Sequence, residues 1–127
     1  MLKTFAFSLL LLLGAGPVLA DWVQLARNEQ SVIYIETPIP KQVGGKVMVW
    51  VLRNYLVMRQ GPGGPYLSAR DQLEVDCAGR RIRRLYASDH PQAMGEGKPV
   101  HFEHGPMSWN VATPDSIASR MVNIACR

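Results

Sequence analysis

The densest group of side chains that could do chemistry is the run at residues 80–84, where only Ile82 is not an arginine. A guanidinium group is always charged and holds carboxylates, phosphates and sulfates through two parallel hydrogen bonds. On an extended strand Arg81 and Arg83 share one side, about 7 Å apart at a rise of roughly 3.3 Å per residue. That spacing suits two anionic groups of a flexible polyanion. The run predicts an anion-binding patch, with Arg81, Arg83 and Arg84 as ligand-binding candidates.

Tyr86 follows the run and is the aromatic candidate for the same ligand. Strict alternation along a strand places Arg84 and Tyr86 on one face and Arg81 and Arg83 on the other. An aromatic ring beside arginines can stack on a glycan or on a protein side chain, although such rings also belong to hydrophobic cores.

Glu74 and Asp76 offer a second interpretation of the arginines. They lie two residues apart, so they share one side of the preceding strand and could pair with Arg81 and Arg83 across the ladder. A carboxylate pair can also perform acid–base catalysis, but the flanking arginines favour ion pairs. The sequence has no Gly-x-Ser-x-Gly motif for a nucleophile. We therefore expect a protein that is not an enzyme.

His101, Glu103 and His104 have residue types that bind zinc or copper. On a strand, positions three apart face opposite sides of the sheet, so the two imidazoles would meet one metal only if this segment were a loop. We expect surface histidines here, with no metal and no cofactor.

Cys77 and Cys126 are the only two cysteines of the chain. In an oxidising compartment such a pair predicts a disulfide. An intramolecular bond would close a loop of about 50 residues and add roughly 4 kcal/mol in the chain-entropy treatment. The alternative is a bond to another chain.

Residues 1–20 have the layout of a secretory signal peptide. Lys3 precedes an apolar run at residues 5–13, and Val18 and Ala20 are small residues at the cleavage positions. The apolar run is shorter than the roughly 20 residues that span a bilayer, and we expect no transmembrane segment. The sequence thus predicts an exported protein of the periplasm or cell surface, with residues 21–127 as one domain.

The formal net charge of +4 restricts the class of partner. An exported protein does not normally meet nucleic acid, so we expect anionic glycans, lipopolysaccharide phosphates, lipid headgroups or acidic faces of other proteins.

Period-two alternation between turn residues predicts an antiparallel sheet. The expected strands are residues 22–27, 31–36, 46–55, 66–77 and 80–87, with weaker candidates at 100–103 and 109–112. Residues 61–65 are expected to form a hairpin tip, and residues 88–99 a polar loop.

The strand expected at residues 46–55 is apolar on both faces, with Val47, Val49 and Val51 on one and Met48, Trp50 and Leu52 on the other. A strand of this kind is covered on both sides. One helix covers only one face, so the other predicts a homodimer. The interface candidates are Val47, Val49, Trp50 and Val51.

A helix is expected near the C-terminus. Thr113 can cap it, and Pro114 suits its first position. Ile117, Met121 and Ile124 recur at helical spacing, whereas Cys126 falls off that stripe. Either the helix ends before Cys126 or a short extended tail follows. The predicted fold is α+β: an antiparallel sheet with a C-terminal helix on one face, the face that carries Cys77.

Short motifs along nearly all of residues 21–127 resemble the surface-adhesin protein E family of Gram-negative bacteria. The matching residues are Trp22, Tyr34, Val49, Trp50, Ser68, Asp76, Cys77, Arg83, Trp109, Pro114, Ser116 and Cys126. The resemblance implies a curved antiparallel sheet, a C-terminal helix tethered by a disulfide between Cys77 and Cys126, and a tendency to dimerise.

The resemblance also implies a function. It favours a non-enzymatic binding protein of the cell envelope that engages other proteins or anionic ligands. One adhesin of the family is lipid-anchored, whereas this chain has no cysteine at the expected cleavage site. The alternative is therefore a periplasmic structural or accessory protein with no adhesin role.

Overall fold

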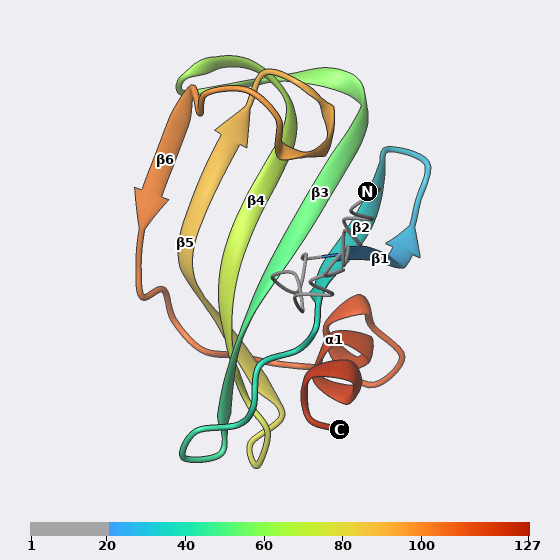
Figure 1. Ribbon diagram of the computed structural model, residues 1–127, viewed down its shortest axis with the longest axis vertical. Helices are drawn as coiled ribbons and strands as arrows, with labels where there is room; N and C mark the ends of the chain where they lie inside the picture. The colour runs from blue at the N-terminus through green and yellow to red at the C-terminus, as the bar shows by residue number, and fades with distance from the viewer. Residues whose placement is uncertain (1–20) are drawn as a thin grey trace, which may run out of the picture.

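The computed structural model describes residues 21–127, and the predicted signal peptide at residues 1–20 lies outside the described residues. Each strand from β1 to β6 pairs with the next in one antiparallel sheet, and β7 pairs with β5 (Figure 1). The strands are β1 (Asp21–Arg27), β2 (Ser31–Thr37), β3 (Lys46–Gly61), β4 (Gly64–Asp76), β5 (Arg81–His90), β6 (His101–His104) and β7 (Asn110–Val111). A 3-10 turn, η1 (Ala93–Gly95), and the helix α1 (Ile117–Ala125) complete the elements. The predicted α+β fold is confirmed.

The helix α1 packs against one face of the sheet, here called the helix face; the opposite face is called the outer face. The core between α1 and the sheet is formed by branched side chains, because alternation turns them inward from neighbouring strands. Its members include Val47, Val49, Val51, Val75 and Val122, none more than 4% exposed.

This core corrects one prediction. Val47, Val49 and Val51 are buried under α1 within a single chain, so they offer no surface to a second copy, and their assignment to a dimer interface is wrong. Trp50 lies on the outer face, where it is partly exposed. Dimerisation itself stays a prediction.

The helix begins three residues later than the sequence suggested. Ser116, not Thr113, is the N-cap, and its Oγ accepts a hydrogen bond from the Ser119 amide at 3.0 Å. Asp115 has a φ of +61°, a left-handed conformation that no helix can contain, so the helix cannot start before it. At the other end Cys126 is the C-cap, and its N–H donates to the Val122 carbonyl at 2.9 Å. The helix therefore ends just before Cys126, which was one of the two alternatives.

The predicted disulfide is confirmed as an intramolecular bond. Cys77 follows β4 directly and Cys126 follows α1, and their Cα atoms are 5.7 Å apart. The bond joins residues separated by 49 positions and ties the end of the helix to the end of a central strand.

The segment expected as a polar loop at residues 88–99 is only partly a loop. β5 continues to His90, and the chain then folds back over the upper part of the outer face. Ser68 Oγ donates to the Gln92 carbonyl at 2.5 Å and accepts from the Gly95 amide at 2.8 Å. This loop helps to bury Leu52 completely, so the chain itself covers that part of the outer face.

β3 extends beyond its predicted end and carries a wide bulge. The ladder pairs Asn54 with Ser68 and then Arg59 with Tyr66, so residues 55–58 lie opposite Leu67 alone. Three apolar side chains of the bulge are exposed: Leu56 at 49%, Val57 at 75% and Met58 at 50%. Among residues 21–127 no helix has the length and apolar character needed to cross a membrane.

Candidate ligand-binding face

Aromatic side chains from three strands lie side by side on the outer face. Trp50 of β3 and Tyr86 of β5 meet edge to face, with ring centroids 6.0 Å apart. Tyr86 stacks on Phe102 of β6 at 6.5 Å, and His104 lies 5.2 Å from the same tyrosine. The register explains this arrangement, because Trp50 and Tyr86 both lie opposite Gln72 of the intervening strand.

Arg70 of β4 connects this group to β1, the strand at the other edge of the sheet. Its guanidinium carbon lies 5.1 Å from the Trp50 ring centroid and 5.7 Å from that of Trp22 on β1. The negative face of an aromatic ring attracts a cation at such distances. Trp22, Trp50, Tyr86, Phe102 and His104 are called the aromatic row below. It runs from β1 to β6 with Arg70 between its two tryptophans.

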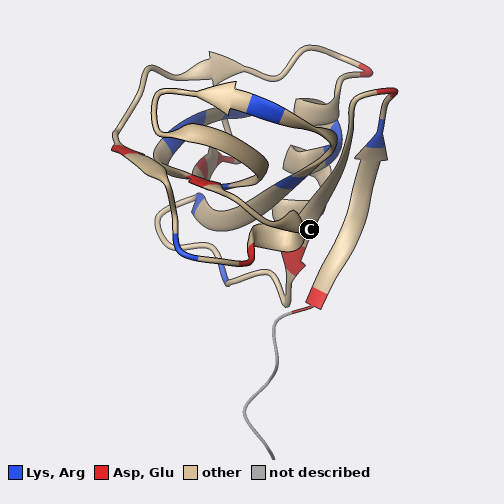
Figure 2. Cartoon of the chain, turned by 90° about the horizontal axis from the view of Figure 1, so that it is seen from above, with Lys and Arg blue, Asp and Glu red and all other residues tan. Residues whose placement is uncertain are grey.

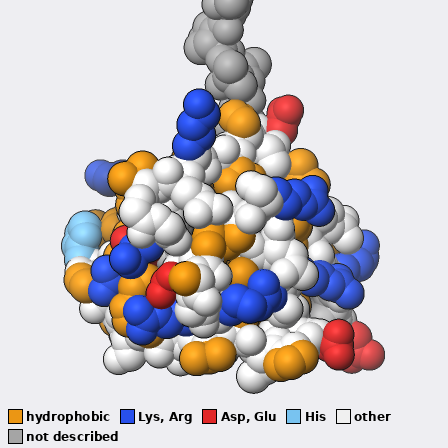
Figure 3. All heavy atoms as spheres, turned by 90° about the horizontal axis from the view of Figure 1, so that it is seen from below, with side chains coloured by type: hydrophobic (Ala, Val, Ile, Leu, Met, Phe, Trp, Pro, Cys, Tyr) orange, Lys and Arg blue, Asp and Glu red, His pale blue; other side chains and the backbone are white. Residues whose placement is uncertain are grey.

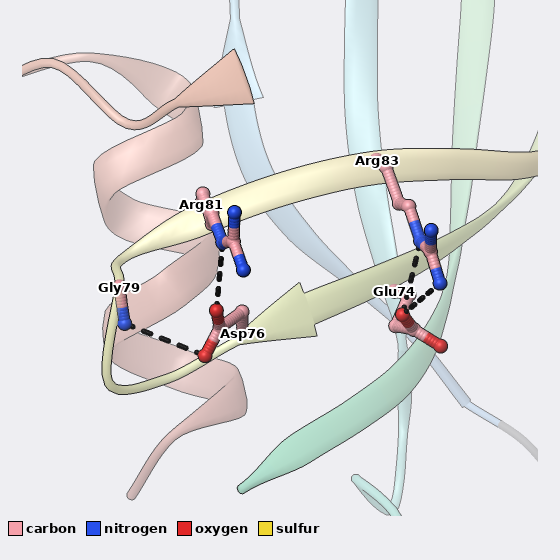
Figure 4. Close-up of polar contacts among 5 residues, drawn as sticks. All are labelled: Glu74, Asp76, Gly79, Arg81 and Arg83. Carbon is pink, nitrogen blue, oxygen red and sulfur yellow. Dashed lines mark hydrogen bonds and ion pairs between the residues drawn. The ribbon is translucent and has the colours of Figure 1, made fainter. Parts of the chain in front are cut away.

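Arg81 and Arg83 lie lower on the outer face, and both form ion pairs across the ladder (Figure 4). Arg81 Nε lies 2.7 Å from Asp76 Oδ2, and Arg83 Nη2 lies 2.8 Å from Glu74 Oε1. Both guanidinium groups also cover the Trp109 ring, at 4.6 Å and 4.4 Å from its centroid. The second interpretation of these arginines is therefore the one that the structure shows. Their role as ligand-binding residues stays a prediction.

The Arg81 pair changes the acidity of its partner. The hydrogen bond from Arg81, and then that from the Gly79 backbone N–H, lower the pKa of Asp76 below its ordinary value of 3.8. The carboxylate form is thus favoured in the folded state.

Arg84 and Tyr86 point to opposite faces, which corrects the expectation that they share one. The ladder pairs Arg84 with Leu73 and Tyr86 with Gln72, so Leu85 is an extra residue in a β-bulge. A bulge of one residue reverses the alternation that follows it. Arg84 therefore faces the helix side, away from Arg81 and Arg83, and the four arginines of residues 80–84 do not form one patch.

On the helix face Arg84 lines a cavity of about 200 Å³ with Arg53, Asp71, Asp89 and Glu103. Arg84 Nη2 pairs with Glu103 Oε2 at 3.2 Å. Burial raises the pKa of Asp71, and the neighbouring Arg53 and Arg84 partly oppose this effect. The cavity holds charges of both signs, so its arginines are balanced by carboxylates.

His90 takes a structural position. His90 Nε2 lies 2.8 Å from Ser88 Oγ, and its Nδ1 lies 3.0 Å from the Gly97 carbonyl oxygen. Ser88 and His90 are both buried, so this Ser–His pair secures the loop after β5 and lies out of reach of a substrate. His101 and His104 sit on opposite faces of β6, and the described part of the chain contains no cluster of three metal-ligating residues.

Positive charge is spread over the molecule. Figure 2 shows basic positions on several strands with acidic positions among them. Seen from below, Lys and Arg side chains alternate with hydrophobic ones (Figure 3). The net charge of +4 is therefore not confined to residues 80–84.

Sequence reasoning missed Trp22, Arg70 and Phe102 as members of this face. Arg70 belongs to the strand expected at residues 66–77, but the sequence could not show that β1 brings Trp22 beside it. The available signal was the alternation of Trp50 with the valines, since it placed that tryptophan and the valines on opposite faces of the strand.

Comparisons with known proteins agree on one family and one fold. The family model described as surface-adhesin protein E matches residues 22–127. No curated protein sequence matches the chain.

Three solved structures of protein E from Haemophilus influenzae are similar to this chain. The crystal structure from a non-typeable strain is 17% identical, with a TM-score of 0.62 over 83% of this chain and 74% of that one. Crystal form II is 18% identical, with a TM-score of 0.59 and coverages of 83% and 86%. A third structure is also 18% identical, with a TM-score of 0.59 and a coverage of 83% for both chains. At these identities the likeness concerns the fold.

Proposed function

This chain belongs to the surface-adhesin protein E family, and on that premise we propose that it is a non-enzymatic adhesin-like protein of the cell envelope that binds its ligand on the outer face of the sheet. Such a ligand is another protein or an anionic molecule. The observation that carries this proposal is the aromatic row with Arg70 inside it.

Aromatic and arginine side chains are the residue types that contribute most to binding surfaces. Trp, Tyr and Arg combine a large apolar area with a polar group, and side chains that are already packed lose little rotamer freedom on binding. Phe102 is 57% exposed although it is a large apolar residue, and Met48 beside the row is 51% exposed. Exposed apolar groups gathered in this way mark interaction surfaces.

A role without catalysis is supported by the state of the reactive groups. Both cysteines are in the disulfide, and the Ser88 hydroxyl is buried against His90. A nucleophile needs access to its substrate.

The test has two parts. Protease treatment of intact cells should remove the protein if it reaches the surface, as adhesion requires; protection would favour the periplasmic accessory role instead. Purified protein should then bind immobilised matrix proteins or heparin, and Trp50→Ala together with Phe102→Ala should weaken that binding. Val57→Ala is the control, because Val57 is a 75% exposed residue of the β3 bulge, outside the aromatic row. Equal binding by the control and the double variant would remove the outer face from the proposal.

A further inference from the structure

Arg70 is held in one position by its surroundings. Its aliphatic stem packs under the loop after β5, where a Cβ built on Gly95 would come within 2.7 Å of Arg70 Cδ. Its guanidinium group lies between Trp22 and Trp50, at 5.7 Å and 5.1 Å from the ring centroids. A side chain fixed in this way loses little conformational entropy when a ligand binds.

The charge of Arg70 has no counterion within the described chain. Arg81, Arg83 and Arg84 each have a carboxylate partner, whereas none of the ion pairs or side-chain hydrogen bonds of residues 21–127 includes Arg70. Its Nε is buried without a hydrogen-bond partner, while its Nη groups are not buried in this way. A partly buried guanidinium with open Nη donors is suited to an incoming carboxylate.

We propose that Arg70 and the aromatic row form a binding site for an acidic polysaccharide in which carboxylate-bearing sugars alternate with neutral ones. The inference rests on the proposed function and specifies its ligand class. Arg70 holds one sugar carboxylate through its Nη groups, and the rings of the sugars that follow it along the chain lie on Trp50, Tyr86 and Phe102.

The aromatic row supplies the contacts for the sugar rings. The axial C–H groups of a pyranose carry a small positive charge and pack against the negative face of an aromatic ring. Trp50, Tyr86 and Phe102 lie at successive centroid distances of 6.0 Å and 6.5 Å. These spacings are comparable to the size of one sugar ring, so the row can contact consecutive units of one chain.

The charges on the outer face favour a glycan with few anionic groups over a densely sulfated one. Arg81 and Arg83 lie on the same face but are neutralised by Asp76 and Glu74. A densely sulfated polymer gains affinity from several unpaired cations, whereas here one unpaired arginine lies among aromatic rings. One carboxylate for each pair of sugars fits that arrangement.

The experiment measures the affinity of the purified protein for hyaluronan oligosaccharides, with heparin and neutral N-acetylglucosamine oligomers as comparison probes. Tryptophan fluorescence serves as the readout, since Trp22 and Trp50 flank Arg70. We expect hyaluronan to bind and to change this fluorescence. Arg70→Gln should weaken binding about tenfold or more, because a bidentate charge-assisted contact is lost. Arg70→Lys, which keeps the charge but not the fork, should fall in between, and Phe102→Ala should also weaken binding.

Arg120→Gln on α1 is the charge-matched control and should bind as the parent does. If Arg70→Gln and Arg120→Gln bind hyaluronan equally, or if heparin binds tightly and hyaluronan does not, the proposal is overturned. If Arg70→Gln fails to fold, the affinities of Arg70→Lys and Phe102→Ala for hyaluronan test the proposal, and parent-like binding by both overturns it. A protein that binds matrix proteins through the outer face but binds no hyaluronan would overturn this inference and leave the proposed function standing.

Discussion

Arg83 lies over Trp109, with its guanidinium carbon 4.4 Å from the ring centroid, while its Nη2 lies 2.8 Å from Glu74 Oε1. One arginine thus joins β5, the neighbouring strand β4 and the segment before β7. The charge of Arg83 is therefore compensated by Glu74 of the same chain.

Replacing Arg83 by Ala should destabilise the fold by about 1–2 kcal/mol. The ion pair and the ring contact are each worth up to about 1 kcal/mol, and Glu74 loses its partner. Urea unfolding measures the change, with Lys41→Ala, an exposed loop residue, as the control. A double-mutant cycle with Trp109→Ala should give a coupling energy different from zero. Additive effects of the two substitutions would show that the contact contributes nothing.

Removing the disulfide should loosen the helix from the sheet. We expect the Cys77→Ser, Cys126→Ser variant to lose about 2–4 kcal/mol of stability, because its unfolded chain is no longer constrained. Thermal unfolding measures the loss, and mass spectrometry of the non-reduced parent should find no free thiol. Two reactive thiols in the parent would contradict the bond.

Asp76 should make stability depend on pH. Its pKa is lowered in the folded state by Arg81 and by the Gly79 N–H, so its contribution is present above the ordinary value of 3.8. That contribution is lost as the pH falls through the lower, folded-state pKa. Asp76→Asn should therefore unfold at lower urea than the parent at pH 7, and the difference should shrink in acid. Glu29→Gln, an exposed substitution in the first turn, is the control. A difference that is independent of pH would refute the role of this ion pair.

The start of α1 can be tested by a pair of similar substitutions. Ser116→Ala removes the N-cap and should cost about 1 kcal/mol. Thr113→Ala should cost less, because Thr113 takes part through its backbone carbonyl, which accepts from Ser116 Oγ at 2.6 Å. Chemical denaturation compares the two variants, and the reverse order would favour a helix that begins at Thr113.

The sequence predicted the features that depend on local periodicity. Alternation around Val49 and Val75 located the central strands, and both residues are core. The helix was placed correctly, but its start was not, because Asp115 has a left-handed backbone conformation that its residue type does not require.

The candidate site was harder to predict, since it depends on contacts between distant segments. Arg70 and Trp22 are neighbours only because β1, β2, β3 and β4 pair in order. The arginines at residues 80–84 stood out by composition, yet Glu74, Asp76 and Glu103 neutralise three of them. Composition identifies charged residues, and only the fold shows which charges are already paired.

The extra residue Leu85 decides which side chains of β5 lie on each face of the sheet. Deletion of Leu85 would remove the bulge, so that side chains alternate strictly along β5. Either Arg81 and Arg83 or Tyr86 would then point to the opposite face of the sheet. Natural relatives that are one residue shorter here should then show exchanged polar and apolar positions on one side of the gap. A change of length at this point would move a whole set of side chains from one face to the other, which a single substitution cannot do.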